Sequence, residues 1–235
     1  MPRSVCVYAH MRLPVRPVTP AVVLPLFLLA PLLAGPQAST PAKPPAPTGP
    51  EGSIAMPADR ADDSYAIYSQ LLPGEPFSRM APELNARWAV AKITVNESDR
   101  DPAVAPQTQL RAPSGNRSGF SEAVEDYESN KDQRIQLTKG PFHLDHDFSL
   151  LSPGQVAALR EARSAPEVTS QAQAQWAGYP GITFFSEVYF DAKHGSALVY
   201  MNNWCARLCA AGTWIYLEKH GGRWVRRSGV VVPGA

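Results

Sequence analysis

The sequence predicts an α+β fold, in which two or three N-terminal helices pack on a C-terminal antiparallel meander of four or five strands. Two observations lead to this prediction. Between residues 182 and 232, runs of aromatic and β-branched residues, which suit a pleated and half-buried surface, alternate with short turn-like breaks. Upstream of this segment, apolar residues recur instead at the spacing of amphipathic helices. Helices followed by consecutive strands are typical of α+β domains.

Four β-rich runs predict the strands of the meander. They cover residues 182–190, 196–202, 213–219 and 223–232. No segment between them is long enough to hold a helix, so parallel crossover connections are excluded. Gly195, Gly221 and Gly222 lie in the breaks and can supply the positive φ that tight hairpins need. The expected connections are therefore hairpins.

The upstream segments alternate between helical and extended patterns. In chain order we expect a helix at 62–72, a strand at 88–95, a loop at 96–116, a helix at 120–130, a strand at 134–137, a helix at 153–162 and a linker at 171–178. Ser118 and Ser152 are the candidate N-caps of the second and third helices. The helices are expected to cover one face of the sheet, and the segment that begins at Trp88 is a candidate fifth strand.

The N-terminus predicts export. Arg3, Arg12 and Arg16 precede a run from Ala21 to Ala34 that contains only apolar residues and proline. A basic flank, a short apolar core and small residues after it are typical of a secretory signal peptide, which we place at residues 1–38. The run is shorter than the roughly 20 residues that cross a bilayer, which disfavours the alternative of an uncleaved N-terminal membrane anchor. The expected localisation is secreted or periplasmic, with membrane contact only through an uncleaved signal segment.

Composition divides the remaining chain into a spacer and one domain. Proline accounts for 24 of the 235 residues, and most prolines lie before residue 115. Residues 39–60 are rich in Pro, Ala, Gly, Ser and Thr and hold little that could be buried, so they predict a disordered spacer. A single α+β domain is expected at 61–235, with its meander at 182–232. The net charge is +1, and the basic residues form no stripe along the chain, so no nucleic-acid partner is expected. The sequence does not indicate any other partner.

Two cysteines would remain after removal of the signal peptide, Cys205 and Cys209. An even number of cysteines in an exported protein favours a disulfide. If their loop forms a helical turn, the two Cα atoms lie about 6 Å apart, which a disulfide tolerates. A redox-active pair is an alternative, although such pairs usually have two intervening residues. A second alternative is a metal site that His194 or His220 completes, although metal binding would need the two thiols to be reduced.

A second polar cluster consists of His143, Asp145, His146 and Asp147. Two imidazoles and two carboxylates within five residues could bind a divalent ion. No thiol partners precede them at the spacing of a standard zinc motif. A polar loop before the helix capped by Ser152 is therefore the favoured interpretation, and metal binding is the alternative.

Two groups of charged residues could be either ordinary solvent-exposed surface or functional sites. Carboxylates between residues 122 and 128 form an acidic helix face, which is more often solvated than used for acid–base chemistry. Arg223, Arg226 and Arg227 flank Trp224 and could bind an anion, but arginines on an edge strand also discourage aggregation. The sequence contains no phosphate-binding glycine loop, nucleophile elbow or His-Glu-x-x-His helix, so it indicates no cofactor.

The C-terminal residues resemble a group of uncharacterised bacterial secreted proteins that share a recurring pattern. The matching segments are FSEVYF at 185–190, ALVY at 197–200, the two cysteines at 205 and 209, and LEKHGGRW at 217–224. Ala206 and Ala210 stand where that pattern has glycine. The resemblance covers the meander and implies its fold, but it implies no activity because none is assigned to the group.

These observations favour a secreted or periplasmic protein that acts as a non-enzymatic binding or structural module of the cell envelope, without a cofactor. The alternative is an envelope enzyme with a small metal-assisted site around His143 and His146. The meander is expected to be the scaffold in either case.

Overall fold

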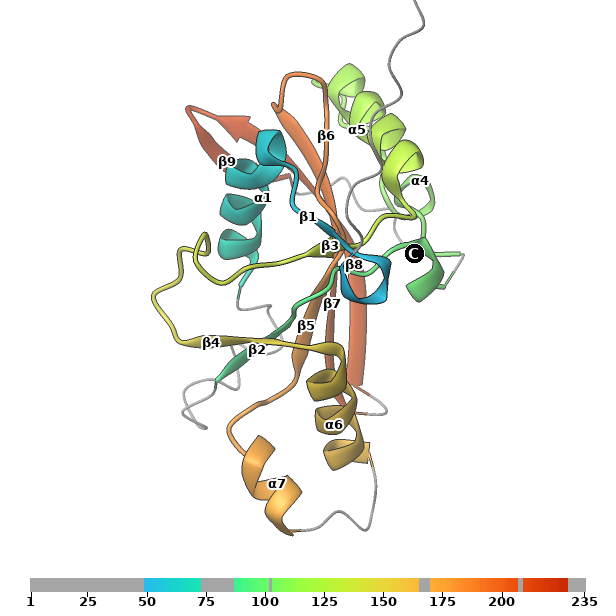
Figure 1. Cartoon of the computed structure of the whole chain (residues 1–235). Coiled ribbons are helices and arrows are strands. Elements are labelled where there is room, and N and C mark those ends of the chain that lie inside the picture. The colour runs from blue at the N-terminus through green and yellow to red at the C-terminus, as the bar shows by residue number, and fades with distance from the viewer. Residues whose placement is uncertain (1–48, 73–86, 102, 165–169, 207–208, 228–235) are drawn as a thin grey trace, which may run out of the picture. The chain divides into compact units, whose positions relative to one another are not determined.

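The structure is a computed structural model that describes residues 49–72, 87–101, 103–164, 170–206 and 209–227. These residues form the predicted α+β fold (Figure 1). The helices are η1 (Pro50–Gly52), α1 (Ala58–Leu71), η2 (Glu97–Asp99), α4 (Pro106–Gln109), α5 (Arg117–Asn130), α6 (Pro153–Ser164) and α7 (Ser170–Trp176). The strands are β1 (Ile54–Ala55), β2 (Trp88–Ala91), β3 (Ile135–Gln136), β4 (Phe148–Leu151), β5 (Ile182–Phe185), β6 (Tyr189–Phe190), β7 (Ser196–Ala206), β8 (Cys209–His220) and β9 (Arg223–Arg226).

The predicted meander is confirmed in its central part. Strands β5, β7, β8 and β9 are neighbours in that order, and each adjacent pair is antiparallel. The first predicted run is divided, because Ser186 interrupts it between β5 and β6. The Ser186 hydroxyl accepts a hydrogen bond from the backbone N–H of Tyr200 at 2.9 Å and donates to the carbonyl of Glu187 at 2.6 Å. The side chain thus replaces a backbone partner and lets the strand bend.

The sheet is mixed and larger than predicted. The segment at Trp88 joins it as expected, but β2 pairs in parallel with both β4 and β5, and the complete sheet has seven strands in the order β4-β2-β5-β7-β8-β9, with β6 on β7. The expectation of a purely antiparallel sheet was therefore wrong. The connections between β2, β4 and β5 contain α5 and α6, and a helix in the connection is what permits parallel pairing. A separate small sheet pairs β1 with β3 in parallel.

Helices lie on both faces of the sheet, so the prediction that they cover one face was also wrong. On one face, Tyr68 of α1 packs on Phe185, with ring centroids 4.7 Å apart. On the other, Tyr127 of α5 packs edge-on against Trp214 at 5.2 Å. In Figure 1, α1 lies to the left of the long strands and α4 and α5 lie to the right. Strands buried on both sides have apolar residues on both faces, and β5 has this pattern, with all four of its residues buried.

The side chain of Asp63 fixes α1 to the end of the meander. Its Oδ1 accepts hydrogen bonds from Lys219 Nζ at 2.6 Å and from Trp224 Nε1 at 3.0 Å. Its Oδ2 lies 3.3 Å from Nδ1 of His194, in the turn between β6 and β7. Burial alone would raise the pKa of Asp63, but the hydrogen bonds from Lys219 and Trp224 outweigh it and lower that pKa.

Helix ends explain several local differences from the predictions. Asn116, rather than Ser118, caps α5 by accepting the N–H of Gly119 at 3.3 Å. Ser152 caps α6 as predicted, because its hydroxyl accepts the N–H of Gln155, and Oε1 of Gln155 accepts the N–H of Ser152 at 2.9 Å.

Three predicted irregular segments contain regular structure. The predicted linker contains α7, and the predicted loop at 96–116 contains η2 and α4. The predicted spacer of residues 39–60 reaches into the described residues, where 49–60 form η1, β1 and the start of α1. The folded part therefore begins by residue 49 rather than at residue 61. The predicted signal peptide, residues 1–38, lies outside the described residues.

Candidate anion-binding pocket

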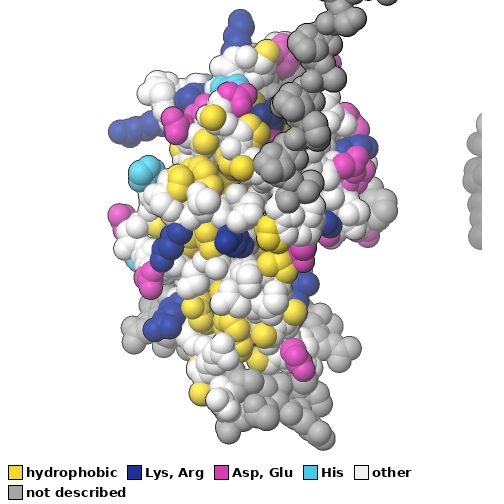
Figure 2. All heavy atoms as spheres, viewed as in Figure 1, with side chains coloured by type: hydrophobic (Ala, Val, Ile, Leu, Met, Phe, Trp, Pro, Cys, Tyr) yellow, Lys and Arg dark blue, Asp and Glu magenta, His cyan; other side chains and the backbone are white. Residues whose placement is uncertain are grey.

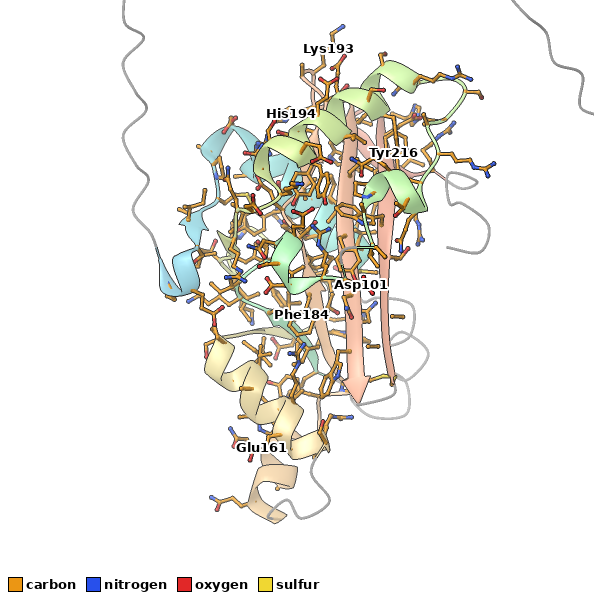
Figure 3. All side chains as sticks on the ribbon, turned by 90° about the vertical axis from the view of Figure 1, so that its right-hand side faces the viewer. Asp101, Glu161, Phe184, Lys193, His194 and Tyr216 are labelled. Atoms are coloured by element: carbon orange, nitrogen blue, oxygen red, sulfur yellow. A yellow bond between two sulfur atoms is a disulfide. The ribbon has the colours of Figure 1, made fainter. Side chains whose placement is uncertain are left out.

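A cavity of about 340 Å³ lies on the face of the sheet that carries α5 and α6. Its lining includes Ala91, Leu151 and Phe184, which stand at or near the carboxyl ends of the three parallel strands β2, β4 and β5. Pro153, the first residue of α6, also lines it. Ligands of open parallel sheets bind outside the carboxyl ends of the strands, and a helix N-terminus there favours an anion. In Figure 3, Phe184 lies between α6, which carries the labelled Glu161, and the light-green α5.

The floor of the cavity is apolar. Ala91, Leu151 and Phe184 belong to one buried cluster with Leu159 of α6, and Val156 packs against this cluster. The cluster forms because alternate residues of β2 and β5 point to the same face as the apolar stripe of α6.

Cationic side chains surround that floor. Lys92, Arg100, Arg134 and Arg160 all line the cavity, together with the two carboxylates of Glu51 and Asp99. Arg134 is paired with Asp99 at 2.7 Å. Among the described residues, Lys92, Arg100 and Arg160 form no ion pair with a carboxylate. Figure 2, which has the same view as Figure 1, shows Lys and Arg side chains between patches of hydrophobic atoms on this side of the molecule.

The guanidinium of Arg160 lies over two aromatic rings. Its guanidinium carbon is 4.8 Å from the centroid of the Phe184 ring and 5.5 Å from that of Trp204. Burial lowers the pKa of Arg160, although an arginine stays protonated at any physiological pH. Stacking uses the face of the guanidinium and leaves its N–H edge for an oxyanion. The geometry therefore presents a fixed positive charge at the cavity wall.

Arg100 also lines the cavity, and three aromatic rings surround its guanidinium. Its guanidinium carbon lies 4.8 Å from the ring centroid of Trp214, 5.3 Å from Tyr200 and 5.5 Å from Tyr127. Its Nε donates to the carbonyl of Asn96 at 3.1 Å. Its Nη1 and Nη2 are buried and have no hydrogen-bond partner within the described residues. Cation–π contacts hold this charge in place without neutralising it.

A second cavity of about 350 Å³ lies between α1, α5 and the turn after β6, and its lining is mainly acidic. Most of its charged groups already have partners in the chain. Asp126 pairs with Arg60, and Glu122 accepts the N–H of Ala192 at 3.2 Å. Part of the predicted solvated face of α5 is thus used for internal contacts, and the first cavity is the better candidate for a ligand.

The predicted disulfide is present. Cys205 and Cys209 are bonded, with their Cα atoms 5.2 Å apart. The bond closes the end of the β7–β8 hairpin, so the predicted helical turn is replaced by two antiparallel strands in which Ala206 pairs with Cys209. Arg163 of α6 donates to the Cys205 carbonyl at 3.4 Å, which connects this end of the hairpin to α6. His194 and His220 do not approach it as metal ligands within the described residues.

The residues of the candidate metal site do not converge. His143, Asp145, His146 and Asp147 are exposed in the segment before β4, and Asp147 pairs with Lys139 at 3.2 Å. Across the described ranges, no group of three or more His, Cys, Asp or Glu side chains is placed to hold a metal ion. An exposed loop lets these side chains point into solvent, and this arrangement agrees with the polar-loop interpretation.

Sequence patterns did not single out the cavity residues. Lys92 follows β2, Arg100 follows η2, Arg160 lies on α6 and Asn202 lies on β7. Each is an ordinary residue in its own segment, and they meet only through pairings between distant strands. The one available signal was a lysine inside the apolar run predicted as a strand at 88–95. In the structure this lysine directly follows β2, where open parallel sheets bind their ligands.

Comparison of the chain with protein-family models, with curated proteins and with solved structures found no match. None of the helices in the described residues combines the length and the apolar character that a membrane crossing requires. The functional argument therefore depends on the cavity.

Proposed function

We propose that this chain is a secreted or periplasmic, non-enzymatic binding protein of the cell envelope, and that it holds a small anionic ligand in the cavity beside α6. The observation that carries the proposal is a cavity of about 340 Å³ whose lining includes Lys92, Arg100 and Arg160, none of them paired with a described carboxylate. Charges kept unpaired around a cavity favour a ligand of opposite sign.

The lining suits binding more than chemistry. Among the described residues that line it there is no His, Cys or Ser, and the hydroxyl of Thr94 already accepts the N–H of Ile135 at 2.7 Å. Of its two carboxylates, Asp99 is held by Arg134. A nucleophile beside a general base is what covalent catalysis needs, and arginine and lysine supply orientation and charge instead.

In this proposal the meander is the scaffold, and α1 and α5 pack on its opposite faces to keep it rigid. The export signal supplies the location, because the basic flank and apolar run before residue 38 are typical of secretion. The bond between Cys205 and Cys209 fits an oxidising compartment.

Calorimetric titration of the exported protein with acetate, phosphate, sulfate and benzoate tests the binding function. We expect saturable binding of at least one of these anions. The double variant Lys92→Gln/Arg160→Gln should weaken it about tenfold or more, because it removes two charge-assisted contacts. The matched control is Arg223→Gln/Arg226→Gln, which removes two exposed arginines from β9 and should leave binding unchanged. Absence of saturable binding, or equal weakening in both variants, would contradict the proposal.

The location has its own test. When the full chain is expressed in a bacterial host, the protein recovered from the periplasm or medium should have a new N-terminus close to residue 38, as determined by mass spectrometry. Recovery of the intact chain from the cytoplasm would contradict the export signal.

A further inference from the structure

Trp204 lies between the disulfide and the cavity. It directly precedes Cys205 on β7, and across the ladder it pairs with Ala210, which directly follows Cys209 on β8. The guanidinium carbon of Arg160, which lines the cavity, lies 5.5 Å from the centroid of the Trp204 ring. The bond therefore joins the two strands beside the residue on which Arg160 stacks.

The β7–β8 ladder is irregular at this point. Trp204 pairs with Ala210 and Ala206 pairs with Cys209, so the register shifts between the two pairs and Cys205 lies within the irregularity. An irregular ladder is locally disrupted and fixes its side chains less firmly than a regular one. On β8, residues 209–212 are exposed and gain little from packing. A covalent bond here supplies a restraint that pairing and burial do not.

A hydrogen bond connects the same end of β7 to α6. Nη1 of Arg163 donates to the carbonyl of Cys205 at 3.4 Å, and its Nη2 donates to the carbonyl of Tyr179. Arg163 follows Arg160 by three positions on α6, so the two side chains are neighbours on the helix surface. One turn of α6 thus contacts the bonded end of β7 and also carries the cation of the cavity.

The position of Arg160 depends on its two stacking contacts. Its side chain is exposed, and it forms no hydrogen bond or ion pair with another described residue. Its guanidinium carbon lies 4.8 Å from the ring centroid of Phe184 and 5.5 Å from that of Trp204. A free arginine side chain samples many rotamers, and each cation–π contact restricts that freedom. Loss of the Trp204 contact would therefore let the charge move away from the cavity.

We propose that the bond between Cys205 and Cys209 positions Arg160 for the anion through Trp204, so that the cavity binds its anion fully only in the oxidised protein. Trp204 is a positioning residue in this arrangement, because it contacts Arg160 and is not among the described residues that line the cavity. This inference rests on the proposed anion-binding function and adds a condition under which that function operates.

Closing the bond is an oxidation. The two thiols lose two protons and two electrons to a disulfide oxidant, which leaves as two thiols. Cys209 is exposed, so such an oxidant can reach it. Disulfides form and persist in the compartments that receive exported proteins. The chain therefore gains its full affinity after export.

Calorimetric titration with acetate, phosphate, sulfate and benzoate tests the inference. For every anion that saturates the wild type, Cys205→Ser/Cys209→Ser and Trp204→Leu should each weaken binding about fivefold, because each loosens one of the two cation–π contacts of Arg160. Trp204→Phe keeps an aromatic ring and should bind within about twofold of the wild type. Reduction of the wild type with dithiothreitol should weaken binding as the double variant does, and reoxidation should restore it.

A general loss of stability would not give this result. So short a ring contributes too little to unfold a domain, and circular dichroism checks that each variant is folded. Asp63→Asn is the stability control, because Asp63 holds Lys219 and Trp224 and does not line the cavity. It should leave the affinity unchanged. An unfolded double cysteine variant would show that the bond holds the whole fold, and would overturn its specific role at Arg160.

The outcomes distinguish this inference from the function on which it rests. Saturable binding by the wild type with the same affinity in Cys205→Ser/Cys209→Ser would overturn the role of the bond and leave anion binding intact. Unchanged affinity in Trp204→Leu, or an equal loss in Trp204→Phe, would overturn the role of the aromatic ring. Failure of the wild type to bind any of the four anions would overturn the anion-binding function and this inference with it.

Discussion

Arg60 of α1 donates a hydrogen bond from Nη1 to Oε1 of Glu187, 2.8 Å away and 127 positions along the chain. Its Nη2 pairs with Asp126 of α5 at 2.5 Å. Glu187 lies in the bend between β5 and β6 and is only 2% exposed. A single guanidinium thus joins the two helices on opposite faces of the sheet to the point where the first strand of the meander is interrupted.

Replacement of this guanidinium should destabilise the fold. Arg60→Met leaves the Glu187 carboxylate buried without a cation, and loss of one partner from a buried pair costs about 3 kcal/mol or more. Urea unfolding at about pH 8 measures the change, with Arg223→Met on β9 as an exposed control. A loss no greater than in the control would show that the pair contributes little.

The protonation of Glu187 should make stability depend on pH. Burial raises its pKa from 4.5 to about 7, against the opposing charge of Arg60 and with a further increase from Asp126. The folded state then binds more protons than the unfolded state between these values. The contribution of Glu187 is present at low pH and is lost as pH rises through about 7, a decrease of about 3 kcal/mol in the free energy of unfolding.

Glu187→Gln should remove this pH dependence. Glutamine keeps an acceptor for Arg60 and does not titrate, so the variant's free energy of unfolding should fall less than that of the wild type between about pH 5 and pH 8. Urea unfolding at several pH values measures both profiles. Parallel profiles for the two proteins would assign the dependence to other groups.

Gly212 is required for the packing of Tyr200. A Cβ at Gly212 would overlap the hydroxyl oxygen of Tyr200, which crosses over this position from the neighbouring strand. Gly212→Ala should cost about 1–3 kcal/mol and weaken ligand binding, because Tyr200 lines the cavity. Gly140→Ala is the matched control, since its added methyl group meets nothing within 4 Å. Equal stability of the two variants would contradict the overlap.

The bond between Cys205 and Cys209 should be structural. Cys205 is 7% exposed, and the bond joins residues only four positions apart. A short ring restricts the unfolded chain little, so Cys205→Ser/Cys209→Ser should lower the free energy of unfolding by about 1–2 kcal/mol. Exported protein should show no free thiol by titration and should keep the bond in millimolar glutathione. Rapid reduction by glutathione would favour the redox alternative.

The sequence predicted the parts of this fold that depend on local patterns. The β-rich runs from residue 182 and their glycine turns are local signals, and they identify β5, β7, β8 and β9. The pairing of β2 with β4 joins two strands of four residues that are separated by α5, and such short strands carry no alternation that fixes a partner. The mixed sheet and the second covered face therefore emerge only in the structure.

The candidate site was less predictable than the fold. Its cations come from four segments, and neither Lys92 nor Arg160 belongs to a motif. The sequence analysis proposed His143 and His146 instead, because these residues are close together in the sequence. These histidines lie in an exposed loop, whereas the cavity is assembled by the convergence of β2, β4, β5 and α6.

The most direct test of the account is a crystal structure of the exported protein soaked with benzoate, one of the anions used to test binding. The account predicts the ligand in the cavity beside α6, with its carboxylate near Lys92 and Arg160. An empty cavity at saturating concentrations of the probe, or a ligand bound elsewhere on the protein, would contradict it.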